Sequence, residues 1–441
     1  MKRKEVLMSE SAKSDLLSAG HRVEEGRNLV VCCDGTSNEP APTGAGVGST
    51  NVVHLFRALS KGEKQIVYYD PGVGTSGILD LWRRRSNRIR ALAEQATGDG
   101  LDEHVISAYR FLCEHYRAGD RISLFGFSRG AYAARVVAGV IHQVGLLRPE
   151  QANLAAFAVK AYKMSSDQDN LAIGWRFARD VGTRRVLIHF LGLWDTVGSM
   201  IAPLRDRLAI GLVHLPYTRR NPSVACVRHA MAIDERRRMF RVNLWHPGPF
   251  VPNPFDPQKT VAQDVAQVWF AGAHGDIGGG HAEAESGLCK VSLRWMVGEA
   301  AAAGLSFNKK MLKNIVEGQK NARGEVVYAP EDPLGPLHPE PTGPWWLLEY
   351  FPKSVKYREW PERKTLGGWY LPAGEPRVLG DTAWIHESVV TRAAQGYAPV
   401  NLGADITRYQ VARTLPLPPP RNMGEGEAGD SQPSPSFLID S

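Results

Sequence analysis

The chain has 441 residues, of which 43% are hydrophobic and 22% charged, with a formal net charge of +7. This length accommodates two or three average domains or one large α/β domain with insertions, and the composition is typical of a globular protein with a substantial core. No run approaches the roughly 18 apolar residues that indicate a membrane span, and no apolar segment follows the basic start that would indicate a secretory signal.

Five cysteines, two of them adjacent at Cys32 and Cys33, form neither a disulfide framework nor a metal-binding spacing. We therefore expect reduced, mostly buried thiols in a cytoplasmic protein; a protein exported by a machinery that reads no N-terminal signal would look the same. No metal or cofactor is expected. No nucleic-acid partner is expected either, because no nucleic-acid-binding motif is recognisable and the mild positive charge specifies none.

The predicted elements begin after a polar N-terminal extension over residues 1–27. The run "NLVVCCDG" (28–35) is continuously apolar and ends in Asp-Gly, which is typical of a strand buried on both faces. "NVVHLFRALS" (51–60) has helical spacing, and "KQIVYYDPG" (64–72) is a short strand closed by a turn. "LDEHVISAYRFLCEHYRAGD" (101–120) has apolar positions on one helical face and a Gly-Asp stop.

The same alternation continues along the chain. "RISLFGF" (121–127) predicts a strand, "RGAYAARVVAGVIHQVG" (129–145) a helix, and "RRVLIHFLGLWD" (184–195) a strand. "VACVRHAMAIDERRRMF" (224–240) is expected to be helical, and "AQVWFAGAHGD" (266–276) is expected to be one more strand. Strands alternating with helices predict an α/β fold with a mostly parallel sheet covered on both faces.

The pattern loosens from about residue 300 into Pro- and Trp-rich segments. We predict an α/β core over 28–300 and a cap with the C-terminal part of the same domain over 301–412. The Pro/Gly/Ser-rich tail over 413–441 is expected to be disordered.

The motif "GFSRG" (126–130) places Ser128 between a buried strand and an alanine-rich helix. This is the context of a nucleophile elbow, a tight strand–turn–helix that lifts a serine hydroxyl above the carboxyl end of a sheet. Gly126 and Gly130 let the turn close without Cβ clashes. The alternative is a turn that only joins the two elements, and the flanking strand and helix disfavour it. Ser128 is therefore the predicted nucleophile.

A serine nucleophile needs a base that is oriented by an acid, and in this fold the chain order is Ser, then Asp or Glu, then His. Asp195 ends an apolar strand-like run, and His274 lies in a Gly-rich loop after a later strand, so both fit that order. The alternative role for Asp195 is that of an N-cap or turn residue. The alternative role for the glycines near His274 is a nest of backbone N–H groups that binds an anion. His386, in "DTAWIHESVV", is the alternative base.

An oxyanion hole needs two N–H donors, one from the residue after the nucleophile and one from a loop after an earlier strand. Arg129 supplies the first, and the loop in "VVCCDGTSN" supplies the second, with Gly35 and Thr36 as the candidate donors. Asp34 either braces this loop or contacts the substrate.

The motifs "VVCCDGTSN", "GFSRGAYAAR", "GLWDTVGS", "RHAMAIDERRRMFRVNLW" and "VWFAGAHGDIGGG" resemble, in this order, an α/β-hydrolase domain family long catalogued as of unknown function. Its best-known members are phospholipase effectors of bacterial type VI secretion. The resemblance runs from about residue 27 to about residue 402, with "IHESVV" and "YAPVNL" near its end. It implies a lipid-ester hydrolase of phospholipase A type with a Ser-Asp-His triad, in which Ser128 and Asp195 match the motifs.

The expected function is therefore hydrolysis of carboxylic esters of lipids, phospholipids first, with a role as an antibacterial or phage-defence effector. The alternatives are an esterase for another acyl substrate and a hydrolase-fold binding protein without turnover. A lipid ester substrate is the expected partner, with peripheral membrane contact and an unidentified protein partner or regulator left open.

Two surface features carry competing interpretations. The basic runs at 81–90 and 236–238 attract anionic headgroups or, as we favour, form solvated faces and internal ion pairs. The second feature is the group of aromatic residues in 341–352, namely Trp345, Trp346, Tyr350 and Phe351. One interpretation is a lid that contacts acyl chains or the membrane interface. The other is a loop-rich cap that packs on the core.

Overall fold

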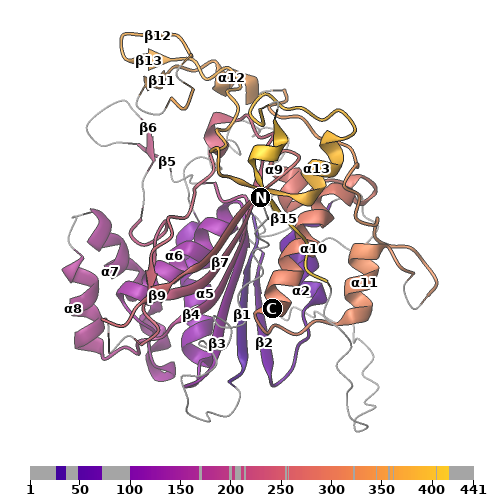
Figure 1. Ribbon diagram of the computed structural model, residues 1–441. Coiled ribbons are helices and arrows are strands. Elements are labelled where there is room, and N and C mark those ends of the chain that lie inside the picture. Colours follow the sequence, from indigo (N-terminus) through magenta and orange to yellow (C-terminus); the bar gives the residue numbers. More distant parts are fainter. Residues whose placement is uncertain are drawn as a thin grey trace, which may run out of the picture.

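An eight-stranded sheet forms the centre of the computed structural model (Figure 1), and all of its strand pairs are parallel. Its strands are β1 (Asn28–Cys33), β2 (Gln65–Asp70), β3 (Arg121–Phe127), β4 (Ile188–Trp194), β7 (Val224–Ala232), β10 (Asp264–Phe270), β14 (Trp384–His386) and β15 (Gln410–Ala412). The structure describes residues 26–35, 48–71, 100–167, 171–197, 201–203, 210–212, 215–253, 256, 258–320, 323–343, 345–355, 358–360, 362–403 and 405–416.

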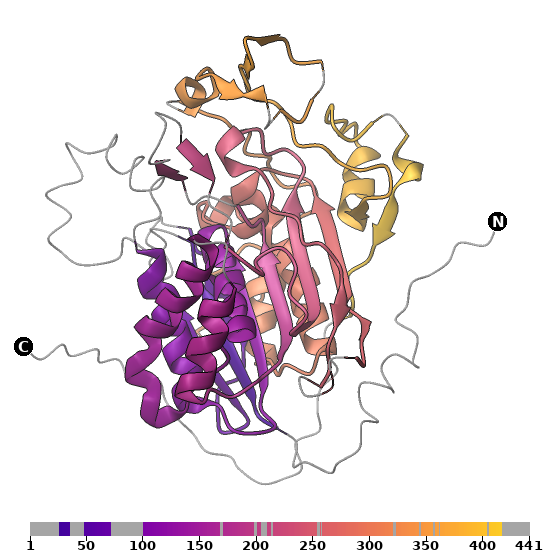
Figure 2. The same cartoon turned by 90° about the vertical axis from the view of Figure 1, so that its left-hand side faces the viewer.

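Helices cover both faces of this sheet, as Figures 1 and 2 show from two sides. One face carries α5 (Leu101–His115), α6 (Arg129–Gln143), α7 (Ala155–Asp167) and α8 (Ala172–Val181). The other carries α2 (Asn51–Ala58), α10 (Gly287–Ala302) and α11 (Lys309–Glu317). The predicted α/β class with a parallel sheet between two helical layers is thus confirmed.

The two cores follow from the alternation of side chains along the strands. In β1, Leu29 and Val31 pack against the α5–α7 side, whereas Val30 and Cys32 pack against the α2, α10 and α11 side. Because both faces are covered, every residue of β1 is buried, which explains its continuously apolar sequence.

The helix expected over 224–240 is wrong, because its first part is the central strand β7, between β4 and β10. The spacing of Val224, Val227 and Ala230 mimics one face of a helix. A strand buried on both faces has no polar alternation to reveal its period of two, so spacing alone does not separate the two structures.

The strand order β4-β3-β1-β2 contains a change of direction. The chain passes from β1 outward to β2 and then returns to the opposite side of β1 to form β3. The next described helix after β1 is α2, on one face of the sheet, whereas β3 is followed by α6 on the other face. In open α/β sheets ligands bind at such a switch point, and Ser128 directly follows β3.

The chain beyond residue 300 contributes to the same sheet and also builds a layer over one end of it. Strands β14 and β15 extend the sheet beyond β10. The layer at the top of Figure 1 contains α12 (Trp345–Glu349) and a small antiparallel sheet of β11 (Lys353–Ser354), β13 (Trp369–Tyr370) and β12 (Thr365–Leu366).

The remaining elements are short. They are the antiparallel pairs β5 (Ile201–Pro203) with β6 (Ile210–Leu212) and β8 (Pro249–Phe250) with β9 (Val261–Ala262), and the helices α9 (His274–Gly278) and α13 (Glu387–Ala393). Within the described ranges, none of the helices combines the length and the apolar character needed to span a bilayer.

Candidate active site

Ser128 occupies a sharp turn between β3 and α6. Its backbone has φ 58° and ψ −121°, which is strained for a residue with a side chain, and its N–H donates to the Trp194 carbonyl oxygen at 3.1 Å. A Cβ added at Gly130 would lie 2.2 Å from the Cys33 carbonyl oxygen, and one at Gly126 would lie 2.4 Å from the Gly130 carbonyl oxygen. The elbow thus closes only because both flanking residues are glycine.

Asp195 lies at the end of the neighbouring strand β4 and is fully buried. It too has a positive φ, 36°, and its Oδ1 accepts the Ala232 N–H at 3.0 Å. Its Oδ2 lies 2.5 Å from Nδ1 of His274. A carboxylate in this position holds an imidazole by one ring nitrogen and leaves the other nitrogen for chemistry.

His274 begins α9, just beyond the carboxyl end of β10. Its ring lies between Phe127 and Phe240, with centroid distances of 4.6 and 4.9 Å. Phe127 precedes Ser128, so this contact places the imidazole beside the nucleophile turn. The His274 N–H donates to Oε2 of Glu235 at 3.3 Å, which orients the start of α9.

Arg377 reaches Asp195 from the C-terminal part of the chain. Its Nη1 and Nη2 lie 2.6 and 2.9 Å from Oδ1 and Oδ2 of Asp195, and its side chain is 1% exposed. It also donates to the carbonyl oxygens of Ala232 and Phe240. Burial alone would raise the pKa of Asp195, but the Arg377 guanidinium and the His274 hydrogen bond outweigh it and hold that pKa well below its usual range. No local sequence signal pointed to Arg377.

His386, the alternative base, lies elsewhere, at the end of β14. Its Nδ1 lies 2.8 Å from Oγ of Ser388, its Nε2 lies 2.9 Å from Oγ1 of Thr414, and its ring stacks on Phe270. Burial lowers the pKa of His386 to about 3. Both ring nitrogens are therefore committed to hydroxyl partners, whereas His274 has the carboxylate partner that a catalytic base requires.

The candidate oxyanion residues come from the start of α6 and from the segment that follows β1. Arg129 is the first residue of α6, where a backbone N–H has no intrahelical acceptor. The Gly35 N–H donates to Oδ1 of Asp34 at 2.6 Å, while Oδ2 of Asp34 accepts from the hydroxyls of Thr50 and Tyr69. Asp34 thus ties the end of β1 to Thr50, which precedes α2, and to Tyr69 of β2. Thr36 lies outside the described residues.

Two further charged residues, Glu235 and Arg237, lie near the start of α9. Glu235 is fully buried, and Arg237 contacts both of its carboxylate oxygens, at 2.9 Å from Oε1 and 2.7 Å from Oε2. Burial would raise the pKa of Glu235, but the Arg237 pairing lowers it below its ordinary value. The Arg237 guanidinium also covers the Phe240 ring at 3.8 Å. The expected internal ion-pair network in "IDERRR" is present at these positions.

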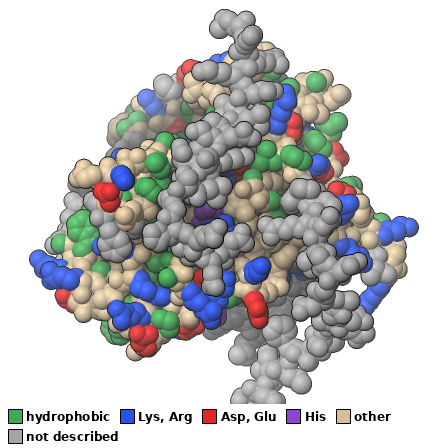
Figure 3. Space-filling view, turned by 60° about the horizontal axis from the view of Figure 1, so that its bottom comes forward, with side chains coloured by type: hydrophobic (Ala, Val, Ile, Leu, Met, Phe, Trp, Pro, Cys, Tyr) green, Lys and Arg blue, Asp and Glu red, His purple; other side chains and the backbone are tan. Residues whose placement is uncertain are grey.

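The basic runs do not form a single cationic surface among the described residues. Figure 3 shows Lys and Arg side chains spread over one face among acidic and apolar ones. Arg236 is exposed and donates to the Gly374 carbonyl oxygen, and the Arg238 N–H donates to Glu349. The run at 81–90 lies outside the described residues.

The aromatic residues of the cap differ in their exposure. Trp345 and Trp346 are half-buried, and the Trp345 ring meets Phe240 edge-on at 5.3 Å. Tyr350 and Phe351 are 59% and 63% exposed. A line of rings therefore runs from His274 through Phe240 to Trp345.

Comparison of the chain with known proteins identifies a family and a relative that it resembles. The family described as "T6SS, Phospholipase effector Tle1-like, catalytic domain" matches residues 27–299. The uncharacterized protein YEL023C of Saccharomyces cerevisiae is 37% identical over 247 residues, which cover 52% of this chain and 34% of that protein. The chain therefore spans about a third of the length of this curated relative.

Two solved structures are also similar. An uncharacterized protein from Pseudomonas aeruginosa is 18% identical, with a TM-score of 0.36, over 69% of this chain and 52% of that one. A Tle1 effector bound to the VgrG spike of a type 6 secretion system is 19% identical, with a TM-score of 0.29, over 60% of this chain and 52% of that one. Both scores are low, and the fold is defined by the sheet topology itself.

Proposed function

The chain belongs to the family of Tle1-like phospholipase effectors of type VI secretion systems, and we propose that it is a serine-dependent phospholipase that cleaves carboxylic esters of membrane lipids. The observation that supports this best is the buried Asp195–His274 pair, with 2.5 Å between Oδ2 and Nδ1, beside the strained turn that carries Ser128. Nucleophile, base and acid come from the ends of three strands of one sheet, in the chain order that this chemistry uses.

In the proposed mechanism, Nε2 of His274 takes the proton of the Ser128 hydroxyl while Oγ attacks the ester carbonyl carbon. The negative charge on the carbonyl oxygen is stabilised by the Arg129 N–H and the first turn of α6. His274 then gives the proton to the leaving alcohol, and an acyl-serine remains. Water, activated by the same imidazole, releases the fatty acid. Asp195 stays ionised throughout and orients the ring.

The side chain of Arg129 supports a phospholipid rather than a neutral ester. It is half-buried next to Ser128, and among the described residues it makes no hydrogen bond or ion pair. Burial lowers its pKa to about 10, so it remains a cation at neutral pH, and no carboxylate in the described part of the chain pairs with it. A substrate phosphate would supply that charge and form bidentate hydrogen bonds. We assign to Arg129 the recognition of the phosphate.

The family membership also motivates a biological proposal, namely that the activity attacks bacterial membranes after export or acts inside the cell in phage defence. The alternative function is hydrolysis of another acyl ester, for which Arg129 would bring no advantage. A binding protein without turnover is the remaining alternative.

The test combines fluorophosphonate labelling with fatty-acid release from mixed phospholipid vesicles. Wild type is expected to label and to release fatty acid, Ser128→Ala to do neither, and Asp195→Ala and His274→Ala to lose release by several orders of magnitude. His386→Ala is the matched control and should retain release. Loss of release in His386→Ala but not in His274→Ala would reverse the assignment of the base.

The substrate class is tested separately with Arg129→Gln. This variant should lose activity on phospholipid while keeping activity on a neutral monoacylglycerol, because only the phospholipid carries the phosphate. An equal loss on both substrates would contradict the role of Arg129. Labelling of Ser128 without cleavage of any phospholipid would refute the phospholipase proposal and leave an esterase.

A further inference from the structure

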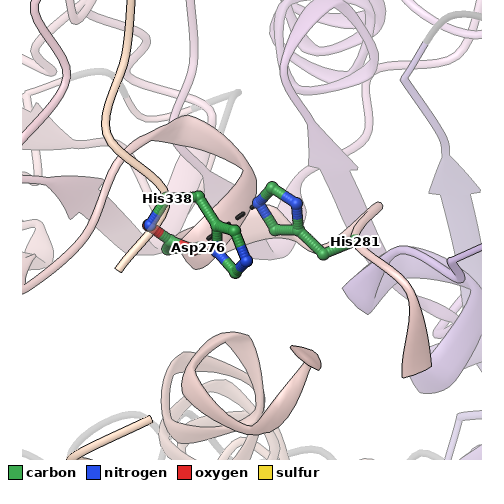
Figure 4. Close-up of side chains that lie close together, drawn as sticks. All are labelled: Asp276, His281 and His338. Atoms are coloured by element: carbon green, nitrogen blue, oxygen red, sulfur yellow. Dashed lines mark hydrogen bonds and ion pairs between the residues drawn. The ribbon is translucent and has the colours of Figure 1, made fainter. Parts of the chain in front are cut away.

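Three titratable side chains meet beside the candidate triad without taking part in it. Asp276 belongs to α9, His281 follows that helix, and His338 comes from a segment 62 residues beyond Asp276 (Figure 4). Oδ1 of Asp276 lies 2.6 Å from Nδ1 of His338 and 3.5 Å from Nε2 of His281. Asp276 is 2% exposed, whereas both imidazoles are half-buried and reach toward solvent.

The two imidazoles stack face to face, with 3.7 Å between their centroids and 16° between their planes. The stacked rings lie next to the buried carboxylate of Asp276. Two imidazole nitrogens and one carboxylate oxygen are a donor set that zinc and neighbouring divalent metals prefer, whereas calcium and magnesium prefer oxygen alone.

The distances suit a single ion. Ligands bound at about 2.0–2.2 Å around a tetrahedral ion lie about 3.3 Å from one another, close to the 3.5 Å between Asp276 Oδ1 and His281 Nε2. One donor atom from each residue lies within 4.8 Å of the other two. A rotation of the His338 ring would exchange its hydrogen bond to Asp276 for a metal bond. Oε2 of Glu285, 3.6 Å from Nε2 of His338, approaches the same cluster from the solvent side.

We propose that Asp276, His281 and His338 bind a divalent transition metal of the zinc class, with Glu285 or water as the fourth ligand. The ion joins the segment of His338 to α9, the short helix that begins with His274. Oδ2 of Asp276 already accepts the N–H groups of Ala273 and His338 at 2.9 and 3.1 Å, so its carboxylate bridges the metal and the start of α9. The role is structural, and it holds whether or not the chain is a phospholipase.

The test uses the full chain, stripped of metal with a chelator and titrated with zinc chloride by calorimetry. One ion per chain is expected, together with a rise in the thermal unfolding temperature and, with cobalt(II), the visible absorption of a tetrahedral site. His281→Ala and His338→Ala should each weaken zinc binding at least about tenfold, since even loss of a residue that only supports a ligand has effects of this size. His246→Ala, which removes an exposed imidazole elsewhere, is the matched control and should bind as wild type.

The proposal is overturned if the wild-type chain binds no zinc, if either histidine variant binds as tightly as wild type, or if magnesium or calcium binds in preference. Circular dichroism tests whether each variant is folded. If an alanine variant does not fold, His281→Gln or His338→Gln takes its place. Because no substrate enters these measurements, failure of the phospholipase proposal does not affect their result.

Discussion

Asp195 is held from three sides, by the Arg377 guanidinium, the His274 ring and the Ala232 N–H. The arginine contact has two opposing effects. It offsets the cost of a buried carboxylate, which is large without a partner, and it places a cation near the imidazole that becomes charged in the proposed mechanism. We interpret Arg377 as a positioning residue, because it acts on the proposed base only through Asp195.

Arg377→Gln is therefore expected to change the pH dependence of activity and not only its size. Arg377 helps to hold the pKa of Asp195 well below its usual range, so without the cation that pKa rises. The carboxylate is then protonated at a higher pH than in wild type, and the acid limb of the kcat/KM profile should move to higher pH. Stability should fall by about 3–5 kcal/mol, as for other broken buried pairs. The profile is measured on phospholipid vesicles.

Arg377→Lys keeps the charge but not the bidentate geometry, and it should restore the position of the acid limb more than the stability. If Arg377→Gln lowers activity equally at every pH, the residue has a structural role alone.

At the scale of elements, the junction of β1, β3 and α6 decides whether Ser128 is presented. Gly130→Ala would place a Cβ 2.2 Å from the Cys33 carbonyl oxygen and 2.4 Å from that of Asp34. Because both obstacles are backbone, α6 must shift, at a cost of about 1–3 kcal/mol, and fluorophosphonate labelling should be lost. Gly380→Ala, at an exposed site with nothing within 4 Å of the added Cβ, should label as wild type. Labelling of Gly130→Ala at the wild-type rate would argue against a tight elbow.

The β14–α13 junction makes a second element-scale prediction. Burial lowers the pKa of His386 to about 3, against about 6.5 in an unfolded chain. Between these values the unfolded state binds more protons, so this residue's contribution to stability is lost as pH falls from about 6.5 toward 3, by up to about 1.4 kcal/mol per pH unit.

Urea unfolding across this pH range measures the effect. His386→Asn should reduce the loss of stability on acidification relative to wild type. An identical pH dependence in the two proteins would show that His386 titrates normally in the folded state.

At the scale of the whole molecule, the match to the family ends before several parts of the fold that the site depends on. Residues 27–299 contain Ser128, Asp195 and His274. Arg377, β14 and β15 come later, and the buried Trp269 of β10 packs in one cluster with Ile385 of β14.

A fragment of residues 27–299 is therefore expected to aggregate or to lack cooperative unfolding and fluorophosphonate labelling, because it leaves Asp195 buried without its cation and uncovers one edge of the sheet. A fragment of residues 26–416 should behave as the full chain. Solubility, thermal unfolding and labelling of the two fragments test this directly. Labelling of the shorter fragment at the full-chain rate would mean that the later segment is dispensable.

The local sequence was sufficient to predict the α/β class, most strands and the turn at Ser128. Each of these depends on neighbouring residues: an apolar run long enough for one strand, an amphipathic stretch for one helix, and glycines where a Cβ would collide. The aspartate and the two candidate histidines were also found, because they follow apolar runs in a known chain order. The strand β7 was missed because burial on both faces removes the alternation that distinguishes a strand.

Tertiary structure decided which distant residues meet. It paired Asp195 with His274 rather than His386, brought Arg377 to the same carboxylate, and joined Asp276 and His281 to His338. No sequence spacing encodes these contacts, since they depend on the order of strands in the sheet and on the packing of loops at its carboxyl edge. Apolar and glycine patterns determine the elements and their turns, whereas the charges that surround the site are selected by burial, which requires a partner for each ionised group.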